Sequence, residues 1–270
     1  MNEIPGILGE IVAKRLGTIE QAKRLHSLEE VRSVAENSET PLSLQESLRT
    51  RSGISLIAEM KRSSPSAGSL DPDLDPAQRA TLYCDAGAAA ISVLTEHDYF
   101  SGSIEDLTAA TRIARPSSVP VLRKDFIVDE YQIHEARSAG ADCILLIIAI
   151  LDPSQYADLF AISTSMGMDV LVEVFDEPEL DIAMEIEPPI IGVNNRNLKT
   201  LKTSLSVFEQ LAKKIPSDRI KVAESGMKNS TDVRRMGRAG AKAVLVGESL
   251  MKAGGNVGNL AREMAEIQVS

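Results

Sequence analysis

Cysteine, histidine and metal-binding motifs are scarce in this sequence of 270 residues. The two cysteines, Cys84 and Cys143, lie in different apolar segments without metal-ligand spacing, so we expect two buried free thiols and no disulfide framework. His26, His97 and His134 are isolated in the chain and fit surface or helix-packing positions. The motifs GxSxG, Walker A, HExxH and CxxC are absent. We therefore predict no metal site.

Positive charge and long apolar runs are also in short supply. The 29 Lys and Arg residues face 39 Asp and Glu residues, which gives a formal net charge of −10. Such a balance argues against a nucleic-acid partner, because a phosphate backbone needs clustered cations. The longest apolar stretch, 143–151, is too short to span a bilayer, and the first residues show no basic segment followed by an apolar one. We expect a cytoplasmic protein with no membrane partner.

Short apolar runs alternate with stretches of helical periodicity from about residue 54 onward. Runs rich in β-branched residues predict strands that are covered on both faces. The predicted strands are 54–60, 89–94, 119–123, 142–148, 169–174, 189–193, 219–223 and 243–247. Eight strands, each followed by a helix, predict an α/β protein whose fold is a closed (β/α)8 TIM barrel, one domain over residues 1–270. An open doubly wound sheet is the competitor, but its GxGxxG fingerprint is absent.

Start and stop signals support the helices between these strands. Asp129 and Asp152 stand at N-cap positions, the latter followed by proline, and 229–231 opens another helix. The tripeptide AGA recurs at 86–88, 139–141 and 239–241, which indicates a repeated helix-to-strand turn.

Residues 1–50 form an N-terminal helical extension that precedes the barrel. Amphipathic helices are predicted at 4–15, 27–32 and 42–48. The extension is expected to pack across one mouth of the barrel, and the sequence leaves open which one.

Polar residues stand at the C-terminal ends of five predicted strands. In this fold those strand ends build the active site. Residues two apart on a strand leave the same face, as Glu59 and Lys61 do. The others are Lys124, Glu173, 194–196 and 224–226. A single charge of this kind is equally consistent with a salt bridge, but the set drawn from five strands favours an active site.

The turns after the last two strands suggest a phosphate site. Ser225-Gly226 and Gly247-Glu248-Ser249 each open a helix, where free amides favour an anion. The loops after strands 7 and 8 are the usual phosphate site of a TIM barrel. The small polar loop 62–68 would suit a mobile lid, although an ordinary solvent loop has the same composition.

The strand-end segments closely resemble the indole-3-glycerol-phosphate synthase family of tryptophan biosynthesis. The match covers residues 50–252 in the family's order and spacing, and the extension resembles the family's extra helices more loosely. The segments are IAEMKRSSPSAG (57–68), ISVLTEHDYFSGS (91–103), PVLRKDFIVDEYQIHEARSAGAD (120–142), LVEVFDEPEL (171–180), IGVNNRNLKTL (191–201), ESGM (224–227) and LVGESLM (245–251).

The resemblance implies a lyase that needs no cofactor. Its substrate would be 1-(2-carboxyphenylamino)-1-deoxyribulose 5-phosphate, which closes its ring, loses CO2 and then loses water to give indole-3-glycerol phosphate. The implied partner is this phosphorylated small molecule, and complexes with other tryptophan-pathway enzymes are left open.

Roles carry over to matching positions. Lys124 resembles the general acid that protonates the ketone oxygen as the ring closes. Glu173 resembles the carboxylate that stabilises developing positive charge and takes part in proton transfer. Lys61, paired with Glu59, would bind the substrate carboxylate or serve as the acid for dehydration, and how the two lysines divide these roles is left open.

The remaining positions that match the family fall into three groups. Those implied to hold the substrate hydroxyls are Asn194 and Ser225, supported by Arg196 and Glu224. Those implied to hold the phosphate are Ser64, Gly226, Gly247 and Glu248. Those implied to form the apolar slot for the ring are Phe100, Phe126, Leu94, Leu145 and Leu198.

One departure from the family and two rival functions remain. Phe175 stands where the family often has histidine, at a position that is not catalytic. Phosphoribosylanthranilate isomerase is the nearest rival, but it would need a Cys/Asp pair at strand ends, and no cysteine stands there. A barrel that binds a phosphorylated metabolite without catalysis is the rival from another class.

Overall fold

A closed barrel of eight parallel strands forms the centre of the protein. The computed structural model describes residue 4 and residues 6–268. The barrel strands are β1 (Ser55–Met60), β4 (Ala90–Leu94), β5 (Val121–Lys124), β6 (Cys143–Ile147), β7 (Asp169–Val174), β8 (Ile190–Asn194), β9 (Ile220–Glu224) and β10 (Ala243–Val246). Each strand pairs with its neighbour in sequence, and β1 pairs with β10 to close the ring. The predicted (β/α)8 barrel is confirmed.

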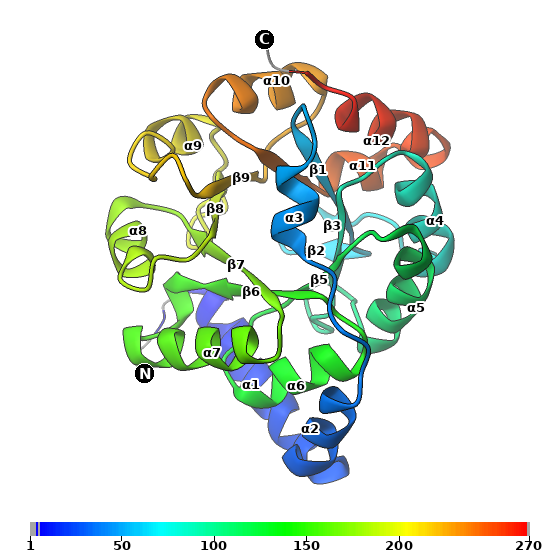
Figure 1. Ribbon diagram of the computed structural model, residues 1–270, viewed down its shortest axis with the longest axis vertical. Coiled ribbons are helices and arrows are strands. Elements are labelled where there is room, and N and C mark those ends of the chain that lie inside the picture. Colours follow the sequence, from blue (N-terminus) through cyan, green and yellow to red (C-terminus); the bar gives the residue numbers. More distant parts are fainter. Residues whose placement is uncertain (1–3, 5, 269–270) are drawn as a thin grey trace.

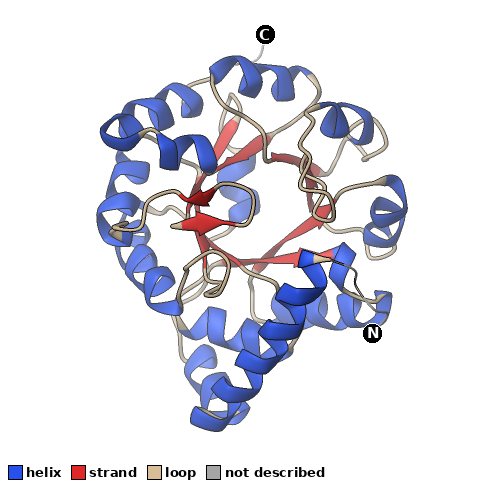
Figure 2. Cartoon of the chain, turned by 180° about the vertical axis from the view of Figure 1, so that it is seen from behind, coloured by secondary structure: helices blue, strands red, loops and turns tan. Residues whose placement is uncertain are grey.

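Helices surround the strands in an outer layer (Figure 2). The barrel helices are α4 (Pro76–Asp85), α5 (Ile104–Ala114), α6 (Glu130–Ser138), α7 (Pro153–Ser165), α8 (Glu177–Met184), α9 (Ser206–Leu211), α10 (Ser230–Arg238), α11 (Glu248–Lys252) and α12 (Val257–Ala265), with short 3-10 turns η1 (Arg115–Ser117), η2 (Ile148–Ile150) and η3 (Gly254–Asn256). The predicted N-caps are confirmed: the side chains of Asp129, Asp152 and Asn229 each accept a hydrogen bond from a backbone amide of the first turn.

Strand boundaries agree with the sequence pattern to within about two residues. The largest difference concerns β5, which begins at Val121 rather than at 119 and continues to Lys124. Pro120 has no N–H to donate to a neighbouring strand, although its carbonyl accepts a bond from the amide of Ile91. The glycines of the three AGA turns adopt the positive φ expected of a helix-ending turn.

The N-terminal extension reaches both mouths of the barrel. It consists of α1 (Ile7–Leu25), α2 (Leu28–Glu36) and α3 (Leu44–Arg49). Helix α3 lies across the mouth seen in Figure 1, where the strands begin. Its Ser47 hydroxyl donates to the carbonyl of Ala89, and Gln45 donates to Asp169 through its amide and its side chain. Helix α3 therefore closes the N-terminal mouth.

Helix α1 lies at the opposite mouth, where the strands end. Arg15 forms an ion pair with Asp125 just after β5, and Lys23 forms one with Asp129 at the start of α6. The helix continues to Leu25, whereas the sequence pattern ended it at Arg15. A single Gly17 costs a helix only about 1 kcal/mol, and the ion pair of Lys23 holds the second half in place.

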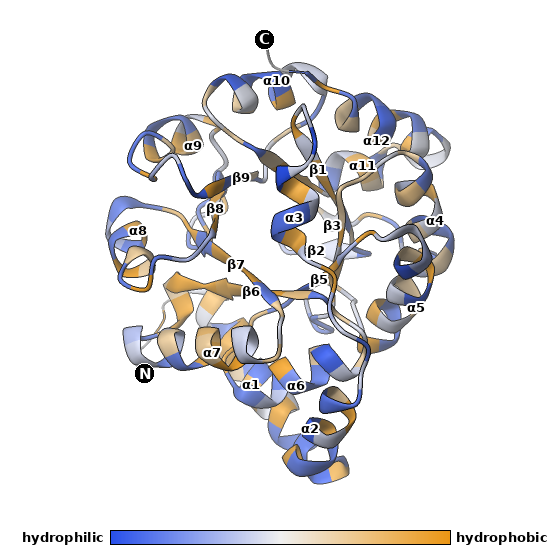
Figure 3. Ribbon diagram, viewed as in Figure 1, coloured by the Kyte–Doolittle hydropathy of each residue, from blue (hydrophilic) through white to orange (hydrophobic). Residues whose placement is uncertain are grey.

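The core follows from the apolar strands, which are the orange elements at the centre of Figure 3. Most strand residues are buried, and the apolar faces of the helices pack against the outside of the barrel. Both cysteines are free, as expected, but only Cys143 is buried; Cys84 is half-buried because it lies on the surface helix α4. His26 and His97 are exposed, and His134 packs between helices. None of the helices among the described residues has the length and apolar character that crossing a bilayer requires.

Truncating Leu48 tests the role of α3 in stability. Leu48 is completely buried under the N-terminal mouth, so Leu48→Ala should lower the free energy of unfolding by about 2–5 kcal/mol. Denaturant titration followed by circular dichroism measures the loss. Leu25→Ala is the control, because the Leu25 side chain is 78% exposed and its loss should change stability by less than about 0.5 kcal/mol. Equal, small losses in both variants would contradict this role of α3.

Candidate active site

A cavity of about 960 Å³ opens at the C-terminal mouth of the barrel. Its floor and walls come from strand ends and from the loops that follow them. All of the residues that the sequence singled out line this cavity, with the exception of Glu224. Phe175 does not line it, because β7 ends at Val174 and Phe175 faces a smaller neighbouring cavity.

Glu59 and Lys61 leave β1 side by side and form an ion pair. Glu59 is buried, and burial by itself would raise its pKa, but the charges of Lys61 and Lys124 outweigh burial and lower the pKa. Gly247 on the neighbouring strand end makes room for this carboxylate, because a Cβ there would lie 2.1 Å from Glu59 Oε1. Glu59 is therefore an ionised carboxylate that holds Lys61 at the cavity wall.

Lys124 lies at the centre of a second, larger group of charges. Its Nζ is 3.5 Å from Glu173 Oε2 and 3.6 Å from Glu224 Oε2. Burial by itself would lower the pKa of Lys124, but the carboxylates of Glu173, Glu224 and Glu59 outweigh it and raise the pKa. Asn194 donates to Glu173 Oε1 at 3.1 Å, which fixes the orientation of that carboxylate. The cavity is thus lined by a charged ammonium group that lies between two carboxylates.

Glu224 lies behind Lys124 rather than on the cavity surface. It ends β9 and is 1% exposed. Its position contrasts with those of Asn194 and Ser225, its predicted partners in binding hydroxyl groups, which both reach the cavity. In this structure Glu224 therefore touches the other catalytic candidates but has no surface toward a ligand.

The turns after β9 and β10 form one end of the cavity. Ser225 and Gly226 both have positive φ, of 64° and 87°, which turns the chain sharply before α10. At the start of α11, Glu248 accepts hydrogen bonds from Arg196 at 3.1 Å and from Lys252 at 2.6 Å. Two cations therefore lie beside these turns, where an anionic group would find both charge and free amides.

The segment after β1 forms a small hairpin beside the cavity. Strands β2 (Ser63–Ser64) and β3 (Gly68–Ser69) pair, where the sequence suggested only a loop. The amide of Ser63 donates to the carbonyl of Phe100 at 3.2 Å, and Arg62 donates to Asp106 at 2.9 Å. These contacts place Ser64 on the cavity wall.

The other side of the cavity is apolar. The rings of Phe100 and Phe126 lie 6.0 Å apart at an angle of 40°. Leu94, Leu145 and Leu198 complete the predicted slot, and helix α1 adds three residues that the sequence analysis missed: Ile7, Leu8 and Ile11. The amphipathic pattern of α1 is the signal that could have found them, but it does not say which surface the helix covers.

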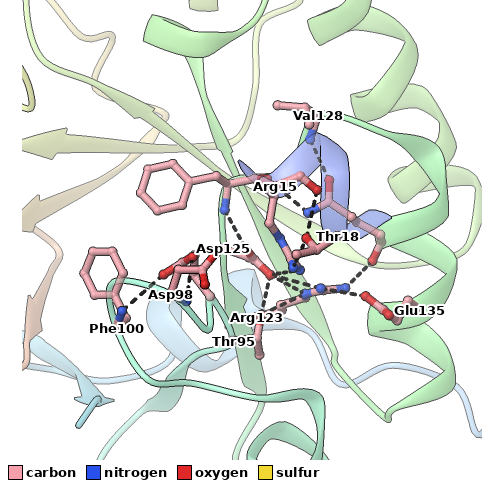
Figure 4. Close-up of polar contacts among 12 residues, drawn as sticks. Arg15, Thr18, Thr95, Asp98, Phe100, Arg123, Asp125, Val128 and Glu135 are labelled. Carbon is pink, nitrogen blue, oxygen red and sulfur yellow. Dashed lines mark hydrogen bonds and ion pairs between the residues drawn. The ribbon is translucent and has the colours of Figure 1, made fainter. Parts of the chain in front are cut away.

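A buried ion network is formed by the two residues that flank Lys124 in sequence, Arg123 and Asp125 (Figure 4). Arg123 is completely buried and donates to Asp125, to Glu135 and to the carbonyl of Gln132. Asp125 also accepts a bond of 2.6 Å from Arg15 of α1. Because Arg123 and Asp125 flank Lys124 in sequence, this network fixes the backbone that carries it and attaches α1 to the same point.

Comparisons with known proteins identify relatives of the whole chain. The family model described as indole-3-glycerol phosphate synthase matches residues 8–264. A protein of that name from Albidiferax ferrireducens is 52% identical over 198 residues, which cover 73% of this chain and 74% of the relative. One from Rhodospirillum rubrum is 46% identical and covers 91% of this chain and 94% of the relative.

A solved structure supports the fold alone. Thiamine phosphate pyrophosphorylase from Pyrococcus furiosus superposes with a TM-score of 0.62 at 15% identity, over 82% of this chain and 96% of the other.

Removing the charge of Asp125 tests the network. Burial by itself would raise the pKa of Asp125, but the charges of Arg15 and Arg123 outweigh it and lower the pKa. Asp125→Asn should lower the free energy of unfolding at pH 7 by about 3–5 kcal/mol, the usual cost of breaking a buried pair. Because the pKa of Asp125 is lower in the folded protein, its ionised carboxylate stabilises the fold at pH values above its ordinary pKa of about 4. This stabilisation is lost as the pH falls through the pKa of the folded state. The difference in unfolding free energy between the wild-type protein and Asp125→Asn should therefore become smaller in acid.

Denaturant titrations of both proteins, from neutral pH into acid, measure this difference in unfolding free energy. Asp98→Asn is the matched control, since Asp98 is exposed in a nearby loop and should change stability by less than about 0.5 kcal/mol. A stability difference that does not change with pH would contradict an electrostatic contribution of Asp125 to folding.

Proposed function

The chain belongs to the indole-3-glycerol phosphate synthase family, and we propose that it performs the family's reaction with Lys124 as general acid and Glu173 as the carboxylate that moves a proton. The enzyme is a carboxy-lyase of tryptophan biosynthesis. It converts 1-(2-carboxyphenylamino)-1-deoxyribulose 5-phosphate into indole-3-glycerol phosphate, CO2 and water. The observation that carries the assignment of roles is the position of Lys124 between buried carboxylates at the cavity wall.

The two ends of the cavity suit the two ends of this substrate. The apolar side formed by Phe100, Phe126 and the leucines would take the carboxyphenyl ring. The turns at Ser225-Gly226 and Gly247-Glu248, with Ser64 from the hairpin, would take the phosphate. A ligand held at both ends would have its ketone between them, and Lys124 lines the same cavity.

Ring closure needs an acid at the ketone oxygen. The ring carbon that bears the carboxylate attacks the ketone carbon, and Lys124 gives its proton to the oxygen, which becomes a hydroxyl group. CO2 then leaves, and the electron pair of the broken carbon–carbon bond stays behind to restore the aromatic ring. Charges fixed on rigid strand ends stabilise this transition state without having to reorganise. Asn194, Ser225 and Arg196 would hold the substrate hydroxyls during the step.

Dehydration needs a second acid and a base. We assign the acid to Lys61, which protonates the departing hydroxyl as water, and the base to Glu173, which takes a proton from the methylene carbon beside the nitrogen. The ion pair of Lys61 with Glu59 supports this division, because it holds the Lys61 ammonium group at the cavity wall. Neither cysteine lines the cavity, which disfavours an isomerase that uses a Cys/Asp pair.

Location and partners follow from the pathway. We propose that the enzyme acts in the cytoplasm, where its phosphorylated substrate is made, and that it can associate with neighbouring enzymes of tryptophan synthesis. The acidic composition supports a small-molecule ligand rather than nucleic acid.

Replacing Lys124 tests the enzyme assignment. Lys124→Met keeps much of the side-chain length but removes the proton, so kcat should fall by about 10²–10⁴-fold, the usual contribution of general acid catalysis, while substrate binding is partly retained. The chain contains no tryptophan, so fluorescence of the indole product appears against a quiet background. Lys213→Met, at an exposed position, should keep full activity. Unchanged turnover in Lys124→Met would favour a barrel that only binds its ligand.

Adding a methyl group at Gly226 tests the phosphate site. A Cβ there would lie 2.7 Å from Thr203 Cγ2, at a positive φ of 87°. Gly226→Ala should raise KM by about 10-fold or more by displacing the turn that faces the phosphate, since a lost charged hydrogen bond costs about 1.5–3 kcal/mol. Gly240→Ala introduces the same kind of strain in open space and should lower stability without changing KM. An equal rise of KM in both variants would contradict a phosphate site at the Gly226 turn.

A further inference from the structure

The carboxylates around Lys124 outnumber the cations that can neutralise them. Lys61 is paired with Glu59, and Arg196 is paired with Glu248. Lys124 is thus the single cation within reach of both Glu173 and Glu224 in the described part of the chain. The charged groups that act on Glu224 come from three strands: Glu173 of β7, Lys124 of β5 and Glu59 of β1.

Glu224 has no other means of balancing a negative charge. It is buried, and neither of its carboxylate oxygens accepts a hydrogen bond from the described residues. An ionised carboxylate in such a place costs several kcal/mol unless a partner compensates it. Its nearest cation, at 3.6 Å, is shared with Glu173.

The backbone of β8 keeps Glu224 in this position. Gly192 lies directly against the carboxylate: a Cβ at this residue would be 2.0 Å from Glu224 Oε1 and 3.1 Å from Leu171 Cδ1. The absence of a side chain at Gly192 creates the space that Glu224 fills, next to Glu173. Two neighbouring carboxyl groups that share one ammonium group favour a state with one proton between them.

We propose that Glu173 and Glu224 share one proton in the resting enzyme and that this proton recharges Lys124 after ring closure. The inference rests on the proposed function, because it assigns the proton to a step of that reaction. Glu224 is a positioning residue in this scheme: it acts through Glu173 and Lys124 and has no contact with the substrate.

The electrostatics of Glu224 and of Lys124 agree with a shared proton. Burial, followed by the charge of Glu173, raises the pKa of Glu224 well above its ordinary value. The surrounding carboxylate charges raise the pKa of Lys124. A higher pKa makes Lys124 a weaker acid. A neutral Glu224 removes one of those charges and makes Lys124 a better acid.

With this pair, every proton that the enzyme donates during the reaction is replaced. The ketone oxygen leaves as water and therefore receives two protons, one from Lys124 and one from Lys61. Lys124 regains its proton from the Glu173–Glu224 pair. The pair regains its own when Glu173 removes a proton from the methylene carbon, and Lys61 regains its proton from solvent at the cavity mouth. The net uptake is one proton for each carboxylate that leaves as CO2.

Infrared difference spectroscopy tests the resting state. At about pH 9 an ordinary carboxyl group, with a pKa near 4, is fully ionised, so a C=O stretch of a protonated acid marks the pair. The wild-type protein should show this band, and Glu224→Gln should not. Glu179→Gln is the matched control, because burial raises the pKa of Glu179 to about 7 and this group is ionised at the working pH. Absence of the band from the wild-type protein would overturn the proposal.

Steady-state kinetics test the use of the proton. Glutamine resembles a neutral Glu224 in shape and charge but cannot pass on a proton, so Glu224→Gln should lower kcat by about 10-fold or more with KM nearly unchanged. In the wild-type enzyme the pair loses its proton as the pH rises, so kcat should fall on the alkaline side; this limb should disappear in the variant. Full activity with an unchanged pH profile would overturn the proposal. A wild-type protein that forms no indole product would instead refute the proposed function.

Discussion

The attraction between Lys124 and the buried carboxylates that surround it is the interaction on which this site depends. Nζ lies within 3.6 Å of two carboxylates that end β7 and β9. An ion inside a barrel mouth is stable only if partners replace its hydration. The barrel supplies these partners from rigid strands, and it opens space for them at Gly192 and Gly247. The charges are therefore in place before any substrate arrives, which is the condition for electrostatic catalysis.

Packing on both sides of β5 supports this arrangement. Lys124 lines the cavity, while the side chains of Arg123 and Asp125 join a network that includes Glu135 of α6 and Arg15 of α1. The N-terminal extension thus serves the barrel at both mouths. Helix α3 seals the mouth where the strands begin, and α1 adds apolar wall to the mouth where they end. The two ends of the extension therefore cover opposite mouths of the barrel.

Much of the fold was predictable because strand and helix periods are local. The eight strands and the caps at Asp129, Asp152 and Asn229 required only neighbouring residues. The approach of Glu59, Lys61, Lys124 and Glu173 followed from the rule that strand ends share one mouth. The contributions of Ile7 and Ile11 could not be predicted, because docking of α1 depends on an ion pair between residues 110 positions apart. The recessed place of Glu224 depends on a missing Cβ in another strand, which no local pattern reveals.

The most direct test of Lys124 as the general acid is a crystal structure with a substrate analogue in which the ketone is reduced to an alcohol. The new hydroxyl oxygen should lie within hydrogen-bonding distance of Lys124 Nζ, with the ring against Phe100 and Phe126 and the phosphate at the turns after β9 and β10. An analogue bound with that oxygen directed away from Lys124, or with its phosphate outside those turns, would contradict it.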